Sequence, residues 1–239
     1  MSDESHDAAA PRRLIFGRRR GRKLSPHREQ TFADWLPRLS IPLPAPGGVL
    51  DPASLFPQPK QAYWVEVGFG DGGHLFALAE QHPEIGFLGV EPFEHGVAKL
   101  VMRLAAKLEA GGADNIRILT DDARLLLKGL PDRSIQRGFT LFPDPWPKKR
   151  HQWRRIVNAE TLAEWARLIP PGGALRLATD VPDYQRWMLR HILAEPRFAW
   201  LAETSRDWLQ RPADWPPSKY EQKAIAAGRM PHYYRLRRV

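Results

Sequence analysis

The most chemically distinctive part of the chain is the stretch FPDPWPKKRHQWRR, residues 142–155. It places a single carboxylate, Asp144, among three prolines, two tryptophans and a run of cations. The six basic side chains of the stretch are Lys148, Lys149, Arg150, His151, Arg154 and Arg155. An acid beside such a run suits a site where the carboxylate stabilises developing positive charge and the cations hold phosphates. The alternative is that Asp144 caps a helix and the cations are merely solvated.

A second pattern is the glycine-rich loop VEVGFGDGGHL. Gly68, Gly70 and Gly73 have the G-x-G-x-x-G spacing of dinucleotide-binding loops, in which glycine lets the backbone approach a ligand. Read with Gly72, the same loop is E-x-G-x-G-x-G, and Glu66 lies directly ahead of it. A carboxylate at that point disfavours a pyrophosphate and suits a cation. S-adenosylmethionine, which carries a sulfonium and an amino group but no phosphate, fits this loop better than NAD does.

Three acids follow three successive predicted strands. Glu66 lies at the end of the first strand, Glu91 after the second and Asp122 after the third. In a parallel sheet these ends meet at one edge, where ligands bind. We expect Glu91 to hold a ribose and Asp122 to bond an adenine amino group, which is how class I methyltransferases arrange their cofactor. A helix N-cap is the other interpretation of Asp122.

Alternating segments must position these residues. Strand-like segments are expected at 62–68, 85–91, 115–121, 135–142 and 174–180, with two more at 198–205 and 230–239. Helix-like segments are expected at 72–83, 93–112, 122–131, 158–173 and 181–196. This order predicts an α/β fold with a doubly wound, Rossmann-like, seven-stranded and mostly parallel sheet.

The chain is expected to have three parts. Residues 1–27 form a disordered basic arm that includes PRRLIFGRRRGRK. Residues 28–60 form a short helix and a proline-rich connector, with Phe32, Trp35 and Leu39 at helical spacing. Residues 61–239 form the cofactor-binding domain.

Composition limits the class of protein. The 239 residues are 43% hydrophobic and 10% aromatic, which is typical of a globular protein, and the net charge of +9 favours a polyanionic partner such as nucleic acid. The chain has no cysteine, and its eight histidines show no i,i+4 pair, so we expect no metal. No segment approaches the roughly 20 apolar residues of a membrane helix and no signal core follows the start, so a cytoplasmic protein without a membrane partner is expected.

The stretch from Asp144 to Arg155 resembles one family closely. Its pattern, D-P-W-x-K-x-R-H-x-x-R-R, is the signature of the tRNA (guanine-N7-)-methyltransferases, class I S-adenosylmethionine-dependent enzymes of the bacterial TrmB type. The motif SKYEQKAIAAGR is similar to the second signature of that family. The loop EVGFGDGGHL and the segments GVE, DDA and ATD also match, so the resemblance runs from Arg18 to the end of the chain. The DPW-to-RR block is highly specific, and the glycine loop is not.

The resemblance implies a function and a set of site residues. The family transfers a methyl group from S-adenosylmethionine to N7 of guanine at position 46, in the variable loop of tRNA. Asp144 is implied as the catalytic residue. The implied cofactor-binding residues are Glu66, Gly68, Gly70, Glu91, Asp122 and Asp144. The implied substrate-binding residues are Lys148, Asp180, Ser218, Lys219, Tyr220 and Glu221. The implied RNA contacts are Arg150, His151, Gln152, Trp153, Arg154 and Arg155.

The chain departs from the family pattern at two positions. Trp153 stands where lysine is usual, which exchanges a phosphate contact for stacking, and Ser218 replaces threonine but keeps the hydroxyl. Guanine N7 has a lone pair and no proton, so Asp144 is expected to position and stabilise rather than to act as a base. Either Asp180 or Glu221 accepts hydrogen bonds from the guanine edge. The sequence is consistent with either a monomer or a homodimer. Two other functions are alternatives, an NAD-dependent oxidoreductase and a non-catalytic RNA-binding protein.

Overall fold

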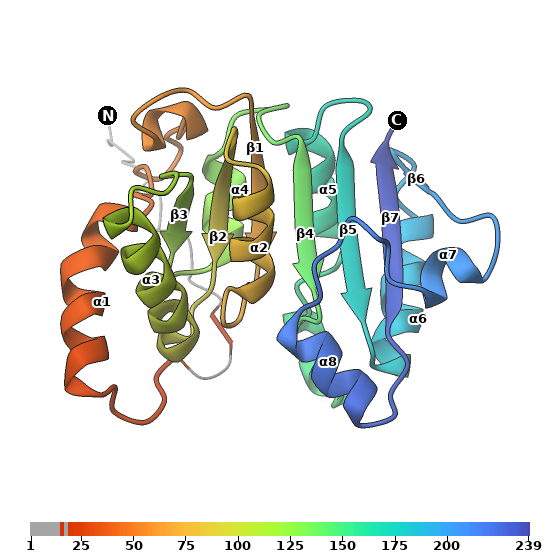
Figure 1. Ribbon diagram of the computed structural model, residues 1–239. Helices are drawn as coiled ribbons and strands as arrows, with labels where there is room; N and C mark the ends of the chain where they lie inside the picture. Colours follow the sequence, from red (N-terminus) through yellow and green to blue (C-terminus); the bar gives the residue numbers. More distant parts are fainter. Residues whose placement is uncertain (1–14, 17–18) are drawn as a thin grey trace, which may run out of the picture.

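The fold is built on a single mixed sheet. The computed structural model describes residues 15–16 and 19–239, and this part of the chain forms seven strands in the order β3-β2-β1-β4-β5-β7-β6 (Figure 1). The strands are β1 (Ala62–Val67), β2 (Ile85–Val90), β3 (Ile116–Leu119), β4 (Arg137–Leu141), β5 (Ala174–Thr179), β6 (Phe198–Trp200) and β7 (His232–Arg238). Each lies within a predicted strand segment, so the prediction of a seven-stranded sheet is confirmed.

The direction of the strands determines where a ligand can bind. β1 pairs in parallel with β2 and β4, and the same parallel pairing continues from β2 to β3 and from β4 to β5. Only β7 runs the other way, antiparallel to both β5 and β6. The chain order reverses between β1 and β4, and the crevice beyond the carboxyl ends of the strands at such a point is the ligand site of doubly wound folds.

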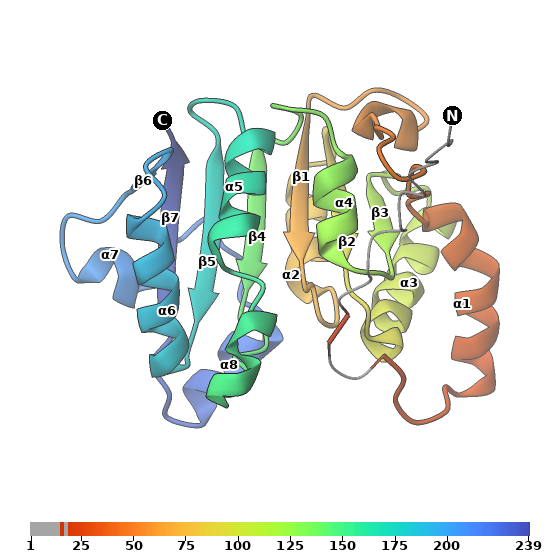
Figure 2. The ribbon, with the colours of Figure 1, turned by 180° about the vertical axis from the view of Figure 1, so that it is seen from behind.

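Helices cover both faces of the sheet. One face carries α2 (Gly73–Gln81) and α3 (Glu94–Glu109), and the other carries α4 (Ala123–Gly129), α5 (Ala159–Leu168) and α6 (Pro182–Leu193) (Figures 1 and 2). Every residue of β2 is buried, as expected for a parallel strand between two helical layers. The predicted Rossmann-like arrangement is therefore confirmed.

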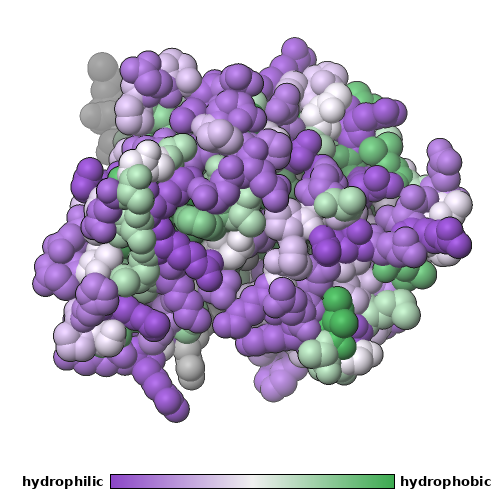
Figure 3. Space-filling view, viewed as in Figure 1, coloured by the Kyte–Doolittle hydropathy of each residue, from purple (hydrophilic) through white to green (hydrophobic). Residues whose placement is uncertain are grey.

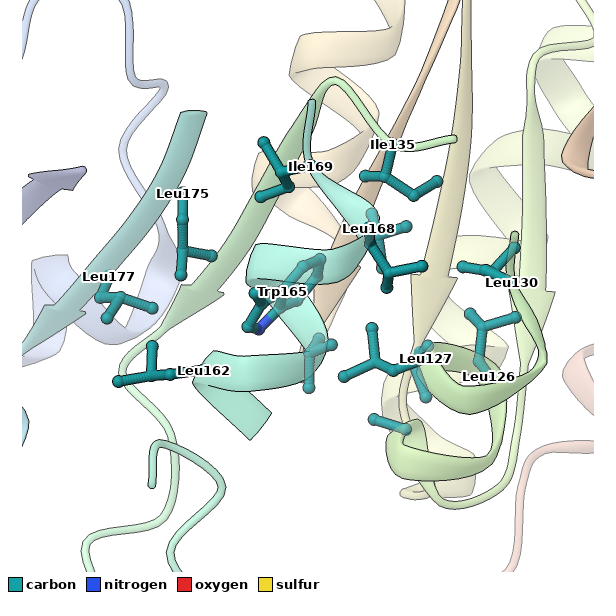
Figure 4. Packing of buried hydrophobic residues seen from close by; sticks show 14 of the residues in the cluster. Leu126, Leu127, Leu130, Ile135, Leu162, Trp165, Leu168, Ile169, Leu175 and Leu177 are labelled. Carbon is teal, nitrogen blue, oxygen red and sulfur yellow. The ribbon is translucent and has the colours of Figure 1, made fainter. Parts of the chain in front are cut away.

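The core behind α4 and α5 fixes the sheet. Figure 4 shows Leu162 of α5 near Leu177 of β5, and the ring of Trp165 lies so close to Gly138 of β4 that a Cβ there would meet it at 2.6 Å. The leucines of α4 belong to the same cluster. Leu175 and Leu177 are both 0% exposed. Truncating either one to alanine would cost about 2–5 kcal/mol of stability.

The segment before the sheet packs on its β3 edge. The predicted N-terminal helix is α1 (Pro26–Leu39), which lies against α3, and a 3-10 turn η1 (Pro52–Leu55) follows in the connector. A parallel bridge joins Ser40 to Ile118, and Ile41 N donates to the carbonyl of Ile118 at 2.8 Å. The three-part division of the chain stays a prediction, and most of the arm lies outside the described residues.

Three short elements lie near the carboxyl ends of the strands or beside the antiparallel pair. They are η2 (Lys149–Arg154), α7 (Arg206–Leu209) and α8 (Lys219–Ala226), and none was predicted. The face that carries α8 is mostly hydrophilic (Figure 3). Among the described residues, no helix is both long and apolar enough to cross a bilayer.

Candidate active site

The ends of four neighbouring strands open on one cavity of about 360 Å³. This volume lies within the range of roughly 300–1,000 Å³ that is usual for small-molecule sites. Its lining includes seven of the residues singled out by sequence, namely Gly68, Gly70, Glu91, Asp122, Asp144, Arg154 and Tyr220. The structure therefore brings together the glycine loop, two of the three acids predicted at the strand ends, and the loop that carries Asp144 and Trp146.

The glycine loop leaves room for a ligand. Gly68 and Gly70 have φ of 75° and 61°, the left-handed region that side chains avoid. A Cβ built on Gly68 would meet no atom within 4 Å, so its backbone is open on that side. The carboxylate of Glu91 fixes the loop, because Oε2 accepts from Gly70 N at 2.9 Å and Oε1 accepts from Phe93 N at 2.9 Å.

Glu91 is also electrostatically unusual. Burial raises its pKa from 4.5 to about 7, although the two backbone hydrogen bonds act in the opposite direction. The nearby carboxylates of Asp144 and Glu66 add to the increase. Such a poised acid at a cavity wall is typical of a functional site.

Glu66 lies behind the loop and does not line the cavity. Its side chain is 3% exposed, and Oε2 pairs with Nδ1 of His74 at 2.8 Å. His74 is itself 2% exposed and lies in the first turn of α2, so the pair ties the end of β1 to the helix that follows the glycines. His74 was not predicted as a site residue, because its only signal in the sequence is its place directly after the glycine run. The cofactor contact of Glu66 stays a prediction.

Asp122 combines both roles considered for it. It is the N-cap of α4, where Oδ1 accepts from Arg124 N at 3.0 Å and pairs with Arg124 Nη1 at 3.2 Å. It also lines the cavity. The cap orients the carboxylate, so capping and ligand binding are compatible at this residue.

The loop that carries Asp144 is held in an unfavourable conformation. Phe142 and Trp146 have φ of 52° and 42°, which costs about 1–3 kcal/mol at each residue. Pro143 and Pro145 stiffen the backbone between them. Asp144 thus projects into the cavity with an exposed side chain, and its partial desolvation raises its pKa above the ordinary value.

The basic residues after the loop divide into exposed and buried sets. Lys148 and Arg150 are exposed. The side chain of Gln152 donates to Asp183 Oδ2 at 3.2 Å. Neither Lys148 nor Gln152 lines the cavity. Arg155 was predicted as an RNA contact, and the structure places its side chain in the interior. Its side chain is 1% exposed, pairs with Asp183 and donates from Nε to the Pro145 carbonyl at 2.8 Å. The structure gives Arg155 a packing role.

Aromatic rings surround Arg154. The rings of Phe16, Trp146 and Trp153 lie 5.1, 4.9 and 5.4 Å from its guanidinium carbon. Trp153 is 57% exposed and its Nε1 donates to the carbonyl of Arg150 at 2.9 Å, while His151 meets the edge of Trp146. Arg154 and Trp146 line the same cavity as Asp144.

The second signature begins α8 beside the glycine loop. The ring of Tyr220 fills the space where a Cβ on Gly70 would lie, at 2.7 Å, and Lys219 Nζ lies 3.5 Å from Asp71 Oδ2. Tyr220 lines the cavity. The start of α8 therefore forms one of its walls.

Ser218 and Glu221 form the capping box of α8. Ser218 Oγ accepts from Glu221 N at 3.1 Å, and Glu221 Oε2 accepts from Ser218 N at 3.2 Å. Glu221 is 3% exposed, and Tyr233 donates to its Oε1 at 2.5 Å. This placement favours a structural role for Glu221 over contact with guanine. Asp180 pairs with Arg229 and lies outside the cavity lining.

Sequence comparisons identify the family. Residues 60–233 match a family model described as "Putative methyltransferase". The tRNA (guanine-N(7)-)-methyltransferase of Rhodospirillum rubrum is 46% identical over 94% of this chain and 87% of the relative. That of Paramagnetospirillum magneticum is 46% identical over 98% of this chain and 97% of the relative. The chain belongs to the tRNA (guanine-N(7)-)-methyltransferase family.

Solved structures agree on the fold of this family member. The crystal structure of the 16S rRNA methyltransferase KamB matches with a TM-score of 0.51 at 17% identity, covering 74% of this chain and 89% of that chain. The structure of an antibiotic-related methyltransferase matches with a TM-score of 0.53 at 16% identity, covering 74% and 87%. At such low identity these matches show the class I methyltransferase fold alone. Within residues 15–16 and 19–239 of this methyltransferase, no group of three His, Cys, Asp or Glu could hold a metal ion.

Proposed function

We propose that this protein transfers a methyl group from S-adenosylmethionine to N7 of a guanine in tRNA, and that this guanine is at position 46 in the variable loop. The observation that carries the proposal is the single cavity shared by Gly68, Glu91, Asp122 and Asp144, with exposed cations following Asp144 in the chain. Relatives named for this reaction match nearly the whole chain. We also place the protein in the cytoplasm, where tRNA is available.

The residues of the cavity fit S-adenosylmethionine. The open backbone at Gly68 allows close approach, and the fixed carboxylate of Glu91 is suited to accept from the ribose hydroxyls. Asp122 is suited to accept from the adenine amino group. Among the described residues, four acids line the cavity, Glu91, Asp121, Asp122 and Asp144, and two cations, Arg124 and Arg154; this excess of negative charge disfavours the pyrophosphate of NAD.

The buried pair of Glu66 and His74 supports the same site from behind. Its 2.8 Å contact holds the strand end and the helix together across the glycine loop. Glu66 does not line the cavity, so we propose that its charge, acting from behind the glycine loop, attracts the ammonium group of the cofactor.

Asp144 acts on charge rather than on a proton. When bound, S-adenosylmethionine supplies a methyl group activated by a sulfonium. The acceptor would be N7 of guanine, whose in-plane lone pair carries no proton, and the sulfur would leave with the electron pair of the bond to the methyl group. The guanine becomes cationic without losing a proton, so the carboxylate of Asp144 stabilises the charge that develops and holds the base in line.

The exposed cations after Asp144 bind the RNA backbone. Lys148 and Arg150 are exposed on the segment that continues from the Asp144 loop, so they are positioned to hold phosphates. Trp153 presents a half-exposed ring to a base or ribose. These contacts fix the register of the tRNA, and the cavity determines that N7 of the guanine is the atom that is methylated.

The experiment that tests the proposal is methyl transfer followed by nucleoside mapping. The purified chain is incubated with methyl-tritiated S-adenosylmethionine and unmodified tRNA, and the product is digested and sequenced. We expect label in 7-methylguanosine at position 46 and none in a tRNA with adenine there. Label in another nucleoside, or at another guanine, contradicts the proposal. Binding of NADH without binding of adenosylhomocysteine would favour an oxidoreductase instead.

A further inference from the structure

The cofactor cavity has a wall that does not come from the sheet. Ile15 and Phe16, two apolar residues inside the Arg-rich arm, line it together with Trp146 and Arg154. Both side chains are partly buried. Figure 2 draws this pair as a short red piece below the ends of β1 and β2. A basic arm that served only to bind RNA would have no need of an aromatic side chain at this place.

Phe16 completes the aromatic cluster around Arg154. Its ring lies 4.8 Å from that of Trp153 and 6.3 Å from that of Trp146, both nearly perpendicular. Its ring is also 5.1 Å from the guanidinium carbon of Arg154. Edge-to-face pairs and cation–π contacts each favour this arrangement. Phe16 therefore connects the arm to the loop of Asp144.

The next described part of the arm is anchored on α3. Glu94 N donates to the carbonyl of Arg19 at 2.9 Å, and the imidazole of His95 hydrogen-bonds the carbonyl of Arg22. Gly21 lies so close to His95 that a Cβ would be 2.6 Å from Cδ2 of the ring. These contacts fix residues 19–22 beside the first turn of α3, the helix that follows β2 and Glu91 in the chain.

We propose that Phe16 is a positioning residue for methyl transfer. It closes the side of the cavity that the sheet leaves open, and it holds Arg154 against Trp146, two residues from Asp144. This inference rests on the proposed function, because it assumes that S-adenosylmethionine occupies the cavity. Closure excludes water from the site and slows the escape of the bound molecule.

The test is the binding of adenosylhomocysteine to the full chain, measured by calorimetry and by stopped-flow fluorescence of the nearby tryptophans. For Phe16→Ala we expect dissociation to accelerate about tenfold, because one cation–π and two ring contacts are lost. We expect kcat to fall while KM for tRNA changes less than twofold. Phe16→Tyr keeps the ring and should restore both the dissociation rate and kcat.

A second variant probes the anchor without touching the cavity. Gly21→Val places a side chain against His95, so it should displace the arm and accelerate dissociation as Phe16→Ala does. Adenosylhomocysteine should then dissociate from the double variant, Gly21→Val with Phe16→Ala, no faster than from either single variant, because both substitutions break the same contact. Val49→Ala, at an exposed residue outside the cavity lining, is the matched control and should leave dissociation unchanged.

The outcomes separate this inference from the proposed function. If the unmodified chain does not bind adenosylhomocysteine, the proposed function fails. If it binds, and Phe16→Ala binds with the same dissociation rate or more tightly, the positioning role of Phe16 is overturned. Additive effects of Gly21→Val and Phe16→Ala would also overturn it, since the anchor would then act elsewhere.

Discussion

Arg155 Nε donates a hydrogen bond of 2.8 Å to the carbonyl of Pro145, the residue directly after Asp144. The same guanidinium pairs with Asp183 on α6 and lies 4.9 Å from the rings of Tyr184 and Trp187. A cation that looks like an RNA contact in the sequence is therefore the support of the Asp144 loop.

Replacing Arg155 should damage the fold and turnover but not the ionic component of tRNA binding. Arg155→Met keeps the volume and loses the pair with Asp183, so we expect a loss of roughly 2–4 kcal/mol in unfolding free energy. Urea unfolding measures the loss, and kcat should fall with it. A changed salt dependence of tRNA affinity, with unchanged stability, would contradict this role.

Replacing Arg150 should weaken tRNA binding but leave the stability of the fold unchanged. Its side chain is exposed, so Arg150→Ala should leave stability within about 0.5 kcal/mol and weaken tRNA binding. The plot of log affinity against log salt should lose about one unit of slope, as expected for one phosphate contact. Filter binding across a salt series provides the measurement. An unaltered slope would remove Arg150 from the contacts.

Asp144→Asn should separate catalysis from binding. The amide preserves shape but carries no charge, so we expect turnover to fall about 10²–10³-fold. Affinity for tRNA and for adenosylhomocysteine should change only severalfold. Single-turnover kinetics on preformed complexes isolates the chemical step. A large loss of tRNA affinity with normal single-turnover rates would argue against an electrostatic role.

Glu91 should make stability depend on pH. Burial raises its pKa from 4.5 to about 7, so the folded state favours the protonated acid and loses stability as pH rises from about 4.5 through about 7. Above that window the cost is fully present and amounts to roughly 3 kcal/mol. The glutamine in Glu91→Gln does not ionise. Without ligand, the unfolding free energy of this variant relative to that of the unmodified chain should therefore be higher at pH 8 than at pH 5. Urea unfolding at the two pH values checks this.

Glu29→Gln is the matched control for that experiment, because Glu29 is exposed on α1. The difference in unfolding free energy between this variant and the unmodified chain should be the same at pH 5 and at pH 8. If Glu91→Gln also differs from the unmodified chain by the same amount at both pH values, burial does not destabilise the ionised form of Glu91 in the folded protein.

The regular part of the fold could be predicted because burial and periodicity agree there. β2 is apolar and buried along its whole length, and a proline or a glycine follows two residues after each of the helices on either side of it. The seven strands and the five helices from α2 to α6 follow from such patterns. The helix α8 was missed because its capping box, Ser218 and Glu221, was interpreted as a substrate motif.

The site could be predicted only as far as residues lie at strand ends. Glu91, Asp122 and Asp144 meet in the cavity because parallel strands end at one edge. His74 and Phe16 could not be found in this way, since one depends on a buried partner eight residues earlier and the other on a contact distant in sequence. Arg154 and Arg155 are neighbours of the same type, and only packing distinguishes them.

The position of β7 has a consequence for the order in which the enzyme is completed. β6 joins the sheet only through β7, and Tyr220, which lines the cavity, lies on α8, the last helix before that strand. A ribosome that has released everything before residue 218 would therefore present a glycine loop without its cover. Competence to modify RNA would arrive with the final strand, so an unfinished nascent chain would be inactive toward the tRNAs around it.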